Sequence, residues 1–353
     1  MRPKRLGDWN WDVRSRAPLR LGLAGGGTDL EEYFGQFGGV VLNATIDRYA
    51  YAHLLRRADD QVVFKADDLA REETLPCGLD FDIREGLSLH RAVYRHMMVH
   101  YNEGRASPLT ITTTIDVPAG SGLGASSALT VALIEAFVTA MQLPLSAYEI
   151  ARLAYDIERC QLGLQGGMQD QYAAAFGGFN FTEFLPGGVG VIVNPLRLRR
   201  SYLNEFESSL VICFSGQSRE SAEIIREQVG GLKSLDDATL DAMHQIKTHA
   251  VSMKSRLLAG DVRGTADVLN ESWLAKKRTA GAVSNSRIES LLGVALGHGA
   301  WAGKVSGAGG GGFIMLLTDP ERRYGLIRTL NEAGGAASAI KLTFEGAEAW
   351  LVP

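Results

Sequence analysis

Cysteine is scarce in this chain, and the scarcity favours a reducing compartment. Only three cysteines occur among 353 residues, far apart and without a CxxC pair. A sparse, odd set of this kind supports neither a disulfide framework nor the usual zinc-ligand spacings. The opening residues, MRPKRLGDWNWDVRSR, are basic but lack the apolar core of a secretory signal. We therefore expect a cytoplasmic protein.

Long apolar runs and a large excess of one charge are also missing. No apolar stretch reaches ~18 residues without polar interruption, so we expect no membrane span. A net charge of −4 argues against nucleic acid as the main partner. Hydrophobic residues at 46% and charged residues at 22% are ordinary for a globular protein. We expect small-molecule partners, and the sequence leaves a homodimer open.

Glycine, in contrast, is abundant and clustered. The 41 glycines exceed the usual share of about 7% and gather in loops. The most informative stretch is DVPAGSGLGASSA at 116–128. An alternating strand pattern precedes it and a long run of helix formers follows. Glycines let backbone N–H groups approach an anion closely, and a helix N-terminus adds partial positive charge. The stretch therefore predicts a nucleotide-phosphate site.

This glycine loop has other interpretations. It lacks the lysine of a Walker A loop. Gly120, Gly122 and Ala125 match the dinucleotide fingerprint, but no acidic residue ends a second strand ~20 positions later. An NAD(P)-dependent oxidoreductase is therefore a remote alternative, and a purely structural turn is another. The two serines that follow favour phosphate with Mg²⁺.

The patterning predicts an α+β protein of two domains. We expect an N-terminal extension over 1–15, a nucleotide-binding domain over 16–195 and a C-terminal domain over 196–353. The expected strands cover 16–24, 40–55, 109–117, 209–214 and both sides of the glycines at 307–312, with a last strand through Ile340, Leu342 and Phe344. Ser146 and Glu149 form a capping-box pattern before one of the helices.

Three motifs carry a family resemblance. Pro118 to Ala128 resembles the phosphate loop of the GHMP kinases. Ala17 to Asp29 resembles their N-terminal substrate motif, and Lys304 to Gly312 their C-terminal glycine motif. The resemblance implies an N-terminal domain like the second domain of ribosomal protein S5 and a ferredoxin-like C-terminal domain. ATP and substrate are then expected in the cleft between them.

The resemblance also implies site residues for ATP and Mg²⁺. Those expected to bind ATP are Pro118, Gly120, Ser121, Gly122, Leu123, Gly124, Ala125, Ser126 and Ser127. Ser126 and Glu158 are expected to ligate Mg²⁺, with Asp156 as a competitor for the carboxylate. Those expected to shape the cleft are Gly307, Gly309 and Gly310. The adenine pocket is expected within 55–100.

Asp170 is the expected general base. Phosphoryl transfer to a hydroxyl needs a carboxylate that accepts the proton and cations that hold the γ-phosphate charge. The family's galactokinase branch has a G-x-M-D-Q segment, and the matching stretch here, GGMQDQ from Gly166, is one residue longer. The competing role for Asp170 is the cap of the following helix. Arg20 is expected to assist the base, although it could be an ordinary surface arginine.

The acceptor is expected to be a sugar. GGGTD at 25–29 resembles the fucokinase and heptose-phosphate kinase branch, where galactokinases carry GEHTD. Segments 158–181, 215–225 and 271–285 are similar to D-glycero-D-manno-heptose 7-phosphate kinases. This similarity implies phosphorylation of the anomeric O1 to the 1,7-bisphosphate, for nucleotide-activated heptose and surface polysaccharide. An unphosphorylated sugar such as L-fucose is the main alternative, and a non-catalytic sugar sensor is another.

The residues expected to contact the sugar come from two glycine-rich segments. They are Gly26, Gly27, Thr28, Asp29, Gly166 and Gly167. Asp29 could instead cap the helix that follows it. A second phosphate on the sugar needs a second cationic pocket, and its candidates are Arg219, Lys276, Lys277 and Arg278. Of these, Arg219 is our first choice and Lys277 our second.

Overall fold

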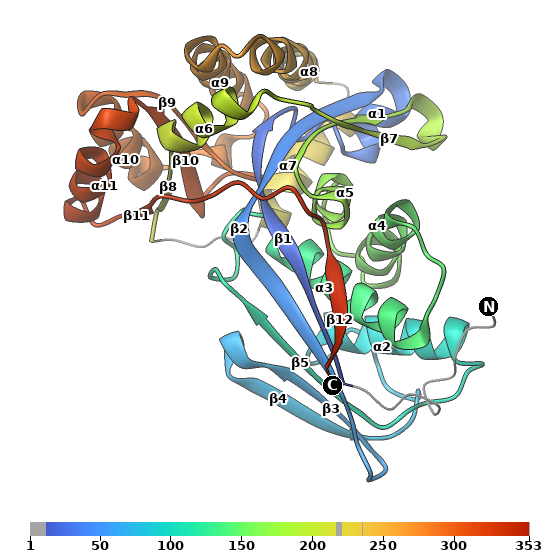
Figure 1. Ribbon diagram of the computed structural model, residues 1–353. Helices are drawn as coiled ribbons and strands as arrows, with labels where there is room; N and C mark the ends of the chain where they lie inside the picture. The colour runs from blue at the N-terminus through green and yellow to red at the C-terminus, as the bar shows by residue number, and fades with distance from the viewer. Residues whose placement is uncertain (1–11, 217–220, 235, 353) are drawn as a thin grey trace.

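The chain folds into two sheet-based parts that share a cleft (Figure 1). The computed structural model describes residues 12–216, 221–234 and 236–352. The predicted two-domain α+β fold is confirmed. Among the described residues, none of the helices has the length and apolar character needed to cross a membrane.

The larger sheet has eight strands. They are β1 (Asp12–Ala24), β2 (Gly39–Arg56), β3 (Gln61–Ala66), β4 (Arg71–Pro76), β5 (Leu109–Ile115), β6 (Phe179–Phe184), β7 (Val191–Pro195) and β12 (Glu348–Val352). The main order is β12-β1-β2-β5-β3-β4, and β6 and β7 extend the other end of β2. All neighbours are antiparallel except β3 and β5. The long strand β2 can serve two sub-sheets because it pairs with β5 through its second half and with β6 through its first.

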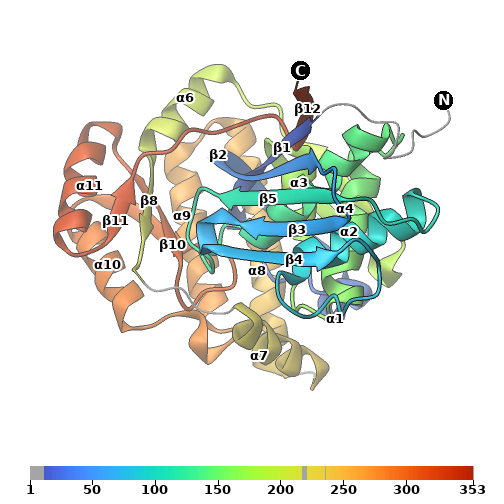
Figure 2. The same cartoon turned by 90° about the horizontal axis from the view of Figure 1, so that it is seen from below.

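One face of this sheet carries helices, with α3 at their centre (Figure 2). The helices of this part are α1 (Glu31–Phe37), α2 (Ser88–Tyr101), α3 (Ala125–Met141), α4 (Ala147–Tyr155) and α5 (Gln169–Phe176). Helix α3 is apolar nearly all round and is buried by β1, β2, α2, α4 and α5, as expected for a helix without a polar face. The predicted capping box of Ser146 and Glu149 opens α4.

The smaller sheet has the antiparallel order β11-β8-β10-β9, which is the ferredoxin-like arrangement. Its strands are β8 (Leu210–Phe214), β9 (Ala300–Val305), β10 (Phe313–Thr318) and β11 (Ala336–Ser338). The helices of this part are α6 (Arg200–Ser209), α7 (Ser221–Lys233), α8 (Asp237–Ala259), α9 (Val262–Lys277), α10 (Ser286–Gly297) and α11 (Arg323–Glu332). Helices α8 and α9 also pack against β1, and residues 17–24 of β1 are consequently buried on both faces.

The C-terminal segment differs from the prediction. The expected strand through Ile340, Leu342 and Phe344 is irregular, and Leu342 makes only an isolated bridge to Ile46. The chain instead returns to the larger sheet, where β12 pairs antiparallel with β1. Although β7 ends at the predicted boundary near 195, residues 348–352 therefore complete the N-terminal sheet. Strand pairing over such a separation cannot be read from local alternation, because a partner at the opposite end of the chain decides it.

Gly177, at the end of α5, is predicted to be essential for this return path. It has φ +63° and ψ 170°, and a Cβ there would lie 2.1 Å from the Glu345 carbonyl oxygen. Gly177→Ala should lower the free energy of unfolding by about 3 kcal/mol, since backbone strain and overpacking add. The measurement is urea unfolding followed by circular dichroism.

Gly188→Ala is the matched control. Gly188 also has a positive φ, of +68°, but no heavy atom lies within 4 Å of its Cβ position. The Gly188→Ala variant should lose about 1–2 kcal/mol of unfolding free energy, which is the cost of the left-handed backbone conformation alone. Equal losses of unfolding free energy in the two variants would show that the close contact between Gly177 and Glu345 causes no further destabilisation.

Candidate active site

Two glycine loops from opposite parts of the chain touch at the cleft. In the first loop, at 120–124, all three glycines have φ between +71° and +75°. The second loop joins β9 to β10, and the Phe313 N–H at its end donates to the Ser121 carbonyl oxygen at 2.9 Å. A Cβ on Gly307 would lie 2.7 Å from the Gly122 carbonyl oxygen. Glycine is required here because the two backbones approach too closely for side chains.

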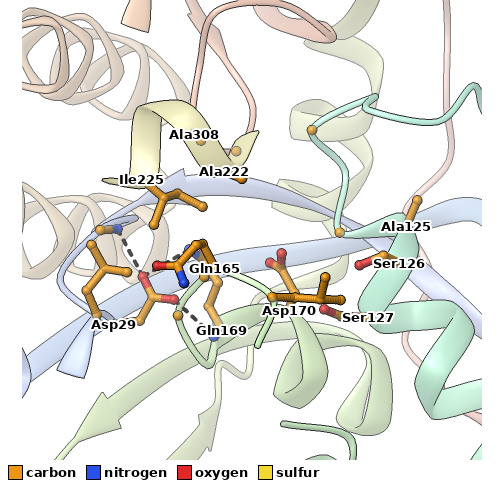
Figure 3. A pocket seen from close by; sticks show the side chains of 18 of the residues that line it. Asp29, Ala125, Ser126, Ser127, Gln165, Gln169, Asp170, Ala222, Ile225 and Ala308 are labelled. Carbon is orange, nitrogen blue, oxygen red and sulfur yellow. Dashed lines mark hydrogen bonds between the residues drawn. The ribbon is translucent and has the colours of Figure 1, made fainter. Parts of the chain in front are cut away.

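The cleft beside these loops has a volume of about 470 Å³ (Figure 3). It brings together most of the predicted site residues. Those on its walls are Arg20, Gly27, Asp29, Gly120, Ser121, Gly122, Gly124, Ala125, Ser126, Ser127, Gly166, Gly167, Asp170 and Gly307. Helix α7 forms the opposite wall through Ala222 and Ile225, which Figure 3 shows facing Gln165 and Gln169.

Several predicted residues do not line the cleft. Leu123 is fully buried in the core, and Pro118 precedes the part of the loop that faces the cleft. Gly309 and Gly310 pack against Val283, where the Gly310 N–H donates to the Val283 carbonyl oxygen at 2.7 Å. These residues set the path of the loops and have no surface in the cleft.

Thr28 is a structural residue rather than a cleft residue. Its hydroxyl lies 2.8 Å from the Gly25 and Val40 carbonyl oxygens and accepts the Val40 N–H at 3.0 Å. It is fully buried and holds the turn after β1 against β2. The GGGTD motif predicted that Thr28 contacts the sugar, but the hydrogen bonds of its hydroxyl all go to the backbone.

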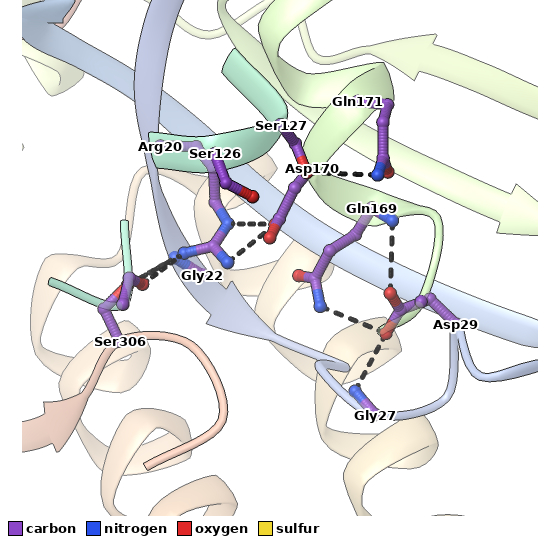
Figure 4. Close-up of polar contacts among 12 residues, drawn as sticks. Arg20, Gly22, Gly27, Asp29, Ser126, Ser127, Gln169, Asp170, Gln171 and Ser306 are labelled. Carbon is purple, nitrogen blue, oxygen red and sulfur yellow. Dashed lines mark hydrogen bonds and ion pairs between the residues drawn. The ribbon is translucent and has the colours of Figure 1, made fainter. Parts of the chain in front are cut away.

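Asp170 and Arg20 form a close ion pair at the centre of the cleft (Figure 4). The Arg20 Nε and Nη2 atoms lie 2.7 and 2.6 Å from Asp170 Oδ1. Arg20 Nη1 also donates to the Gly122 carbonyl oxygen at 2.7 Å and to Ser306 Oγ at 3.2 Å. The side chains are 4% exposed for Arg20 and 23% for Asp170. Arg20 is therefore not a surface arginine, and the carboxylate faces the cleft.

Asp170 does not cap its helix. Helix α5 has Met168 as its N-cap, without a side-chain hydrogen bond, and Asp170 is the second residue of the helix. A Cβ on Gly124 would lie 3.2 Å from the Asp170 carboxyl carbon. The glycine loop and the carboxylate are thus in van der Waals reach, which suits transfer of a group held by the loop to an acceptor beside Asp170.

Glu158 lies behind the serines at the start of α3. It is fully buried on a π-helical turn over Asp156–Gln161. Ser126 Oγ donates to Glu158 Oε1 at 3.0 Å, Ser127 Oγ to Oε2 at 2.8 Å, and the Gln171 side-chain amide also donates to Oε2. The competing Asp156 points away and pairs with Arg152 at 3.0 Å.

The donor set at these serines fits Mg²⁺. Hydroxyl and carboxylate oxygens are the hard ligands that Mg²⁺ accepts, and this ion takes few protein groups besides phosphate and water. Ser126 is on the cleft wall, and its bond to Glu158 leaves the hydroxyl lone pairs free. Glu158 itself is withdrawn from the cleft. In the described parts of the chain, no group of three or more His, Cys, Asp or Glu residues is placed to hold a metal ion.

Asp29 is fixed at the other end of the cleft by donors on both oxygens. Oδ1 accepts from the Gly27 N–H at 2.9 Å and the Gln169 side-chain amide at 3.0 Å, and Oδ2 accepts the Gln169 N–H at 3.1 Å. Helix α1 begins after Leu30 with no side-chain cap, so Asp29 does not cap it. A Cβ on Gly167 would lie 2.0 Å from Asp29 Oδ2, which explains the glycine there.

Two lysines of the C-terminal part reach the N-terminal part. Lys304 on β9 donates to the Gly22 and Leu23 carbonyl oxygens at 2.9 and 3.2 Å. Lys276 on α9 donates to the Gly26 carbonyl oxygen at 2.9 Å. Burial lowers the pKa of Lys276 to about 8 and the pKa of Lys304 to about 7, since charged groups lose hydration in the interior.

The second basic pocket differs from the prediction. Lys277 is not on the cleft wall, because its Nζ pairs with Glu289 at 3.3 Å and lies 5.7 Å from the centre of the Trp273 ring. Neighbouring residues of a helix point about 100° apart, so only one of the two adjacent lysines can face the cleft. Arg219 lies outside the described residues.

Comparison with known proteins adds to this geometry. The model of the GHMP kinases N terminal domain matches residues 88–178, and that of the GHMP kinases C terminal matches residues 253–336. A D-glycero-alpha-D-manno-heptose 7-phosphate kinase of Campylobacter jejuni is 41% identical over 341 residues, covering 96% of this chain and 99% of the relative. The chain belongs to the GHMP kinase family. The family membership predicted from the three motifs is confirmed, and the chain is a kinase by family.

Solved structures agree with this assignment. A structure described as a D-glycero-D-manno-heptose 1-phosphate kinase from Bacteriodes thetaiotaomicron superposes with a TM-score of 0.83 at 40% identity. The match covers 97% of this GHMP kinase and 99% of the other chain. A dinucleotide site is not supported, since the glycine loop follows β5 in a largely antiparallel sheet and not in a parallel one.

Three residues of this GHMP kinase were not predicted from the sequence. Gln169 holds Asp29, Gln171 holds Glu158 and Ser306 holds Arg20. Gln169 had a signal, because it is the extra residue that makes GGMQDQ longer than the family segment. The other two depend on which side chains meet across the fold. Lys276, one of the predicted basic candidates, lines the cleft.

Lys304 should give the stability of this kinase a distinct pH dependence. With a folded-state pKa of about 7, against 10.5 for the unfolded chain, Lys304 loses its proton on folding between these values. The cost of burying the charge is therefore complete below pH 7 and fades as the pH rises toward 10.5, so this group makes stability increase with pH.

The variant Lys304→Met removes this proton release. Its free energy of unfolding should rise less steeply between pH 7.5 and 9.5, by up to about 1.4 kcal/mol per pH unit. Denaturant unfolding at several pH values measures the slope. Parallel curves for the variant and the wild type would contradict the assignment.

Proposed function

We propose that the chain is a cytoplasmic, ATP- and Mg²⁺-dependent kinase that phosphorylates O1 of D-glycero-D-manno-heptose 7-phosphate. The product would be the 1,7-bisphosphate, for nucleotide-activated heptose and surface polysaccharide. The observation that carries the proposal is the Asp170–Arg20 pair, which lies in one cleft between the glycine loop and Asp29. The similarity to a named heptose 7-phosphate kinase supports the choice of sugar.

The glycine loop would hold the triphosphate of ATP. Its backbone N–H groups and the N-terminus of α3 favour an anion. Ser121 adds a second indication: the residue is 1% exposed and lines the cleft, and its hydroxyl has no hydrogen-bond partner in the described part of the chain. A buried hydroxyl without a partner is costly, and a phosphate oxygen would satisfy it.

Asp170 would accept the proton of the sugar O1 as the bond to phosphorus forms. Its carboxylate is exposed toward the cleft, and Arg20 fixes its orientation through two contacts to one oxygen. The other carboxylate oxygen therefore remains available to the acceptor hydroxyl. The guanidinium also offsets charge that develops on the transferring group.

Ser126 would hold Mg²⁺ through its hydroxyl, and Glu158, which is withdrawn from the cleft, would support Ser126 from behind. When bound, the ion offsets charge on the ATP phosphates. Glu158 keeps Ser126 oriented by accepting a hydrogen bond from its hydroxyl. The bonds from Ser127 and Gln171 hold the Glu158 carboxylate in turn, so the start of α3 keeps its position relative to the π-helical turn.

Asp170→Asn tests the role of the base. The amide keeps an oxygen for Arg20 but cannot accept the proton, so kcat should fall by about 10³-fold with little change in melting temperature. Coupled measurement of ADP release and differential scanning fluorimetry provide the two readings. Asp156→Asn is the matched control, since that carboxylate pairs with Arg152 outside the cleft. Near wild-type turnover in the Asp170 variant would remove it as the base.

A substrate panel tests the choice of sugar. ADP release should be fastest with the heptose 7-phosphate and much slower with the unphosphorylated heptose or L-fucose. Phosphorus NMR of the product should show a new anomeric phosphate. Faster turnover of L-fucose would favour the alternative substrate class. A heptose 1-phosphate as the preferred acceptor would assign the other reaction, which the description of the solved relative suggests.

A further inference from the structure

Helix α9 ends in two adjacent lysines with opposite surroundings. Lys276 is 4% exposed and lies on the wall of the cleft. Lys277 pairs with Glu289 outside it. The two residues have the same side chain, so the fold alone decides that one ammonium group is directed at the substrate region.

The Lys276 ammonium has unused hydrogen-bonding capacity. An ammonium carries three N–H donors. Within residues 12–216, 221–234 and 236–352, its hydrogen-bond partner is the Gly26 carbonyl oxygen at 2.9 Å. Asp29 and Arg20 are the charged groups that act on it most strongly. Asp29, however, already accepts from Gly27 and Gln169. Lys276 is therefore a buried cation without a direct anionic partner.

Glycine keeps this ammonium accessible from the cleft. A Cβ at Gly27 would lie 3.3 Å from Lys276 Nζ and 3.2 Å from the methyl carbon of Met243. Gly27 also belongs to the cleft wall. A side chain at this position would therefore crowd the ammonium and occupy the space in front of it. The space is bordered by Lys276, the glycine turn and Asp29.

The other cations of the cleft are placed differently. Arg20 uses its guanidinium on Asp170, Gly122 and Ser306 at the reacting end. Arg159 lies next to Glu158, at 3.7 Å on the metal side, and its Nε donates to the Gly167 carbonyl oxygen at 3.4 Å. Among the described residues, Lys276 is the cation at the glycine turn, where Asp29 would hold the sugar. An anionic group of the acceptor, away from the reacting hydroxyl, would meet it there.

We propose that Lys276 binds the phosphate that the sugar already carries, and that it thereby selects phosphorylated over unphosphorylated sugars. This inference rests on the proposed function. A phosphate dianion supplies the charge partner that Lys276 lacks, and charge-assisted hydrogen bonds are stronger where water is excluded. Because α9 belongs to the C-terminal part, the contact would also hold this part against the glycine turn.

The test compares wild type, Lys276→Met and Lys277→Met on heptose 7-phosphate and on the unphosphorylated heptose. Lys276→Met should lower kcat/KM for the phosphorylated sugar by about 10- to 100-fold, mainly through KM. Its kcat/KM for the unphosphorylated sugar and its KM for ATP should change less than about threefold. Lys277→Met, the matched control, should behave as wild type with both sugars.

Each other outcome overturns a specific statement. Equal losses with both sugars would make Lys276 a structural residue, and no loss would remove it from the site. Loss of selectivity in Arg159→Gln instead would move the phosphate to the metal side. A wild type without preference for the phosphorylated sugar would refute the proposed function itself. Should Lys276→Met fail to fold, Lys276→Gln keeps a donor for the Gly26 carbonyl and carries the same comparison.

Discussion

The partly buried ion pair between Arg20 and Asp170 is the interaction on which the rest of the site depends. One guanidinium bonds the carboxylate on α5, the Gly122 carbonyl of the first glycine loop and Ser306 of the second. Three segments far apart in sequence are thus positioned by one side chain on β1. Since buried charges are costly unless they are paired and hydrogen-bonded, the geometry is set within narrow limits.

Close backbone contact is the second constraint, and it explains the glycines around the cleft and at the crossing of the C-terminal segment. The loops around Gly122 and Gly307, the contact of Gly167 with Asp29 and the crossing of Gly177 by Glu345 all lack room for a Cβ. These glycines do not serve to make the site flexible. They allow main chains to lie against each other and against acidic side chains, so that polar groups surround a cleft of fixed shape.

Much of the fold and the main parts of the site could be predicted from the sequence. The capping box at Ser146 and the glycine loop before α3 are specified by residues close together in the chain. The pairing of Asp170 with Arg20, 150 residues away, was predicted only through the family resemblance. The structure places Lys276 and not the predicted Lys277 on the cleft wall, and local sequence could not show this because it depends on the rotation of α9. Gln171 and Ser306 were missed for a related reason: their partners lie on other elements, and no local pattern marks a side chain for a distant carboxylate or guanidinium.

The position of β12 has a consequence for how the chain is made. Translation reaches this strand after all the other described strands, yet it pairs with β1, the first of them. Until β12 has been synthesised, this edge of β1 has no partner, and an unpaired edge is a template for association with other chains. The N-terminal sheet is therefore completed only after β12 has left the ribosome. A product that ends before β12 would keep its glycine loops and Asp170 but would expose this edge to aggregation and proteolysis.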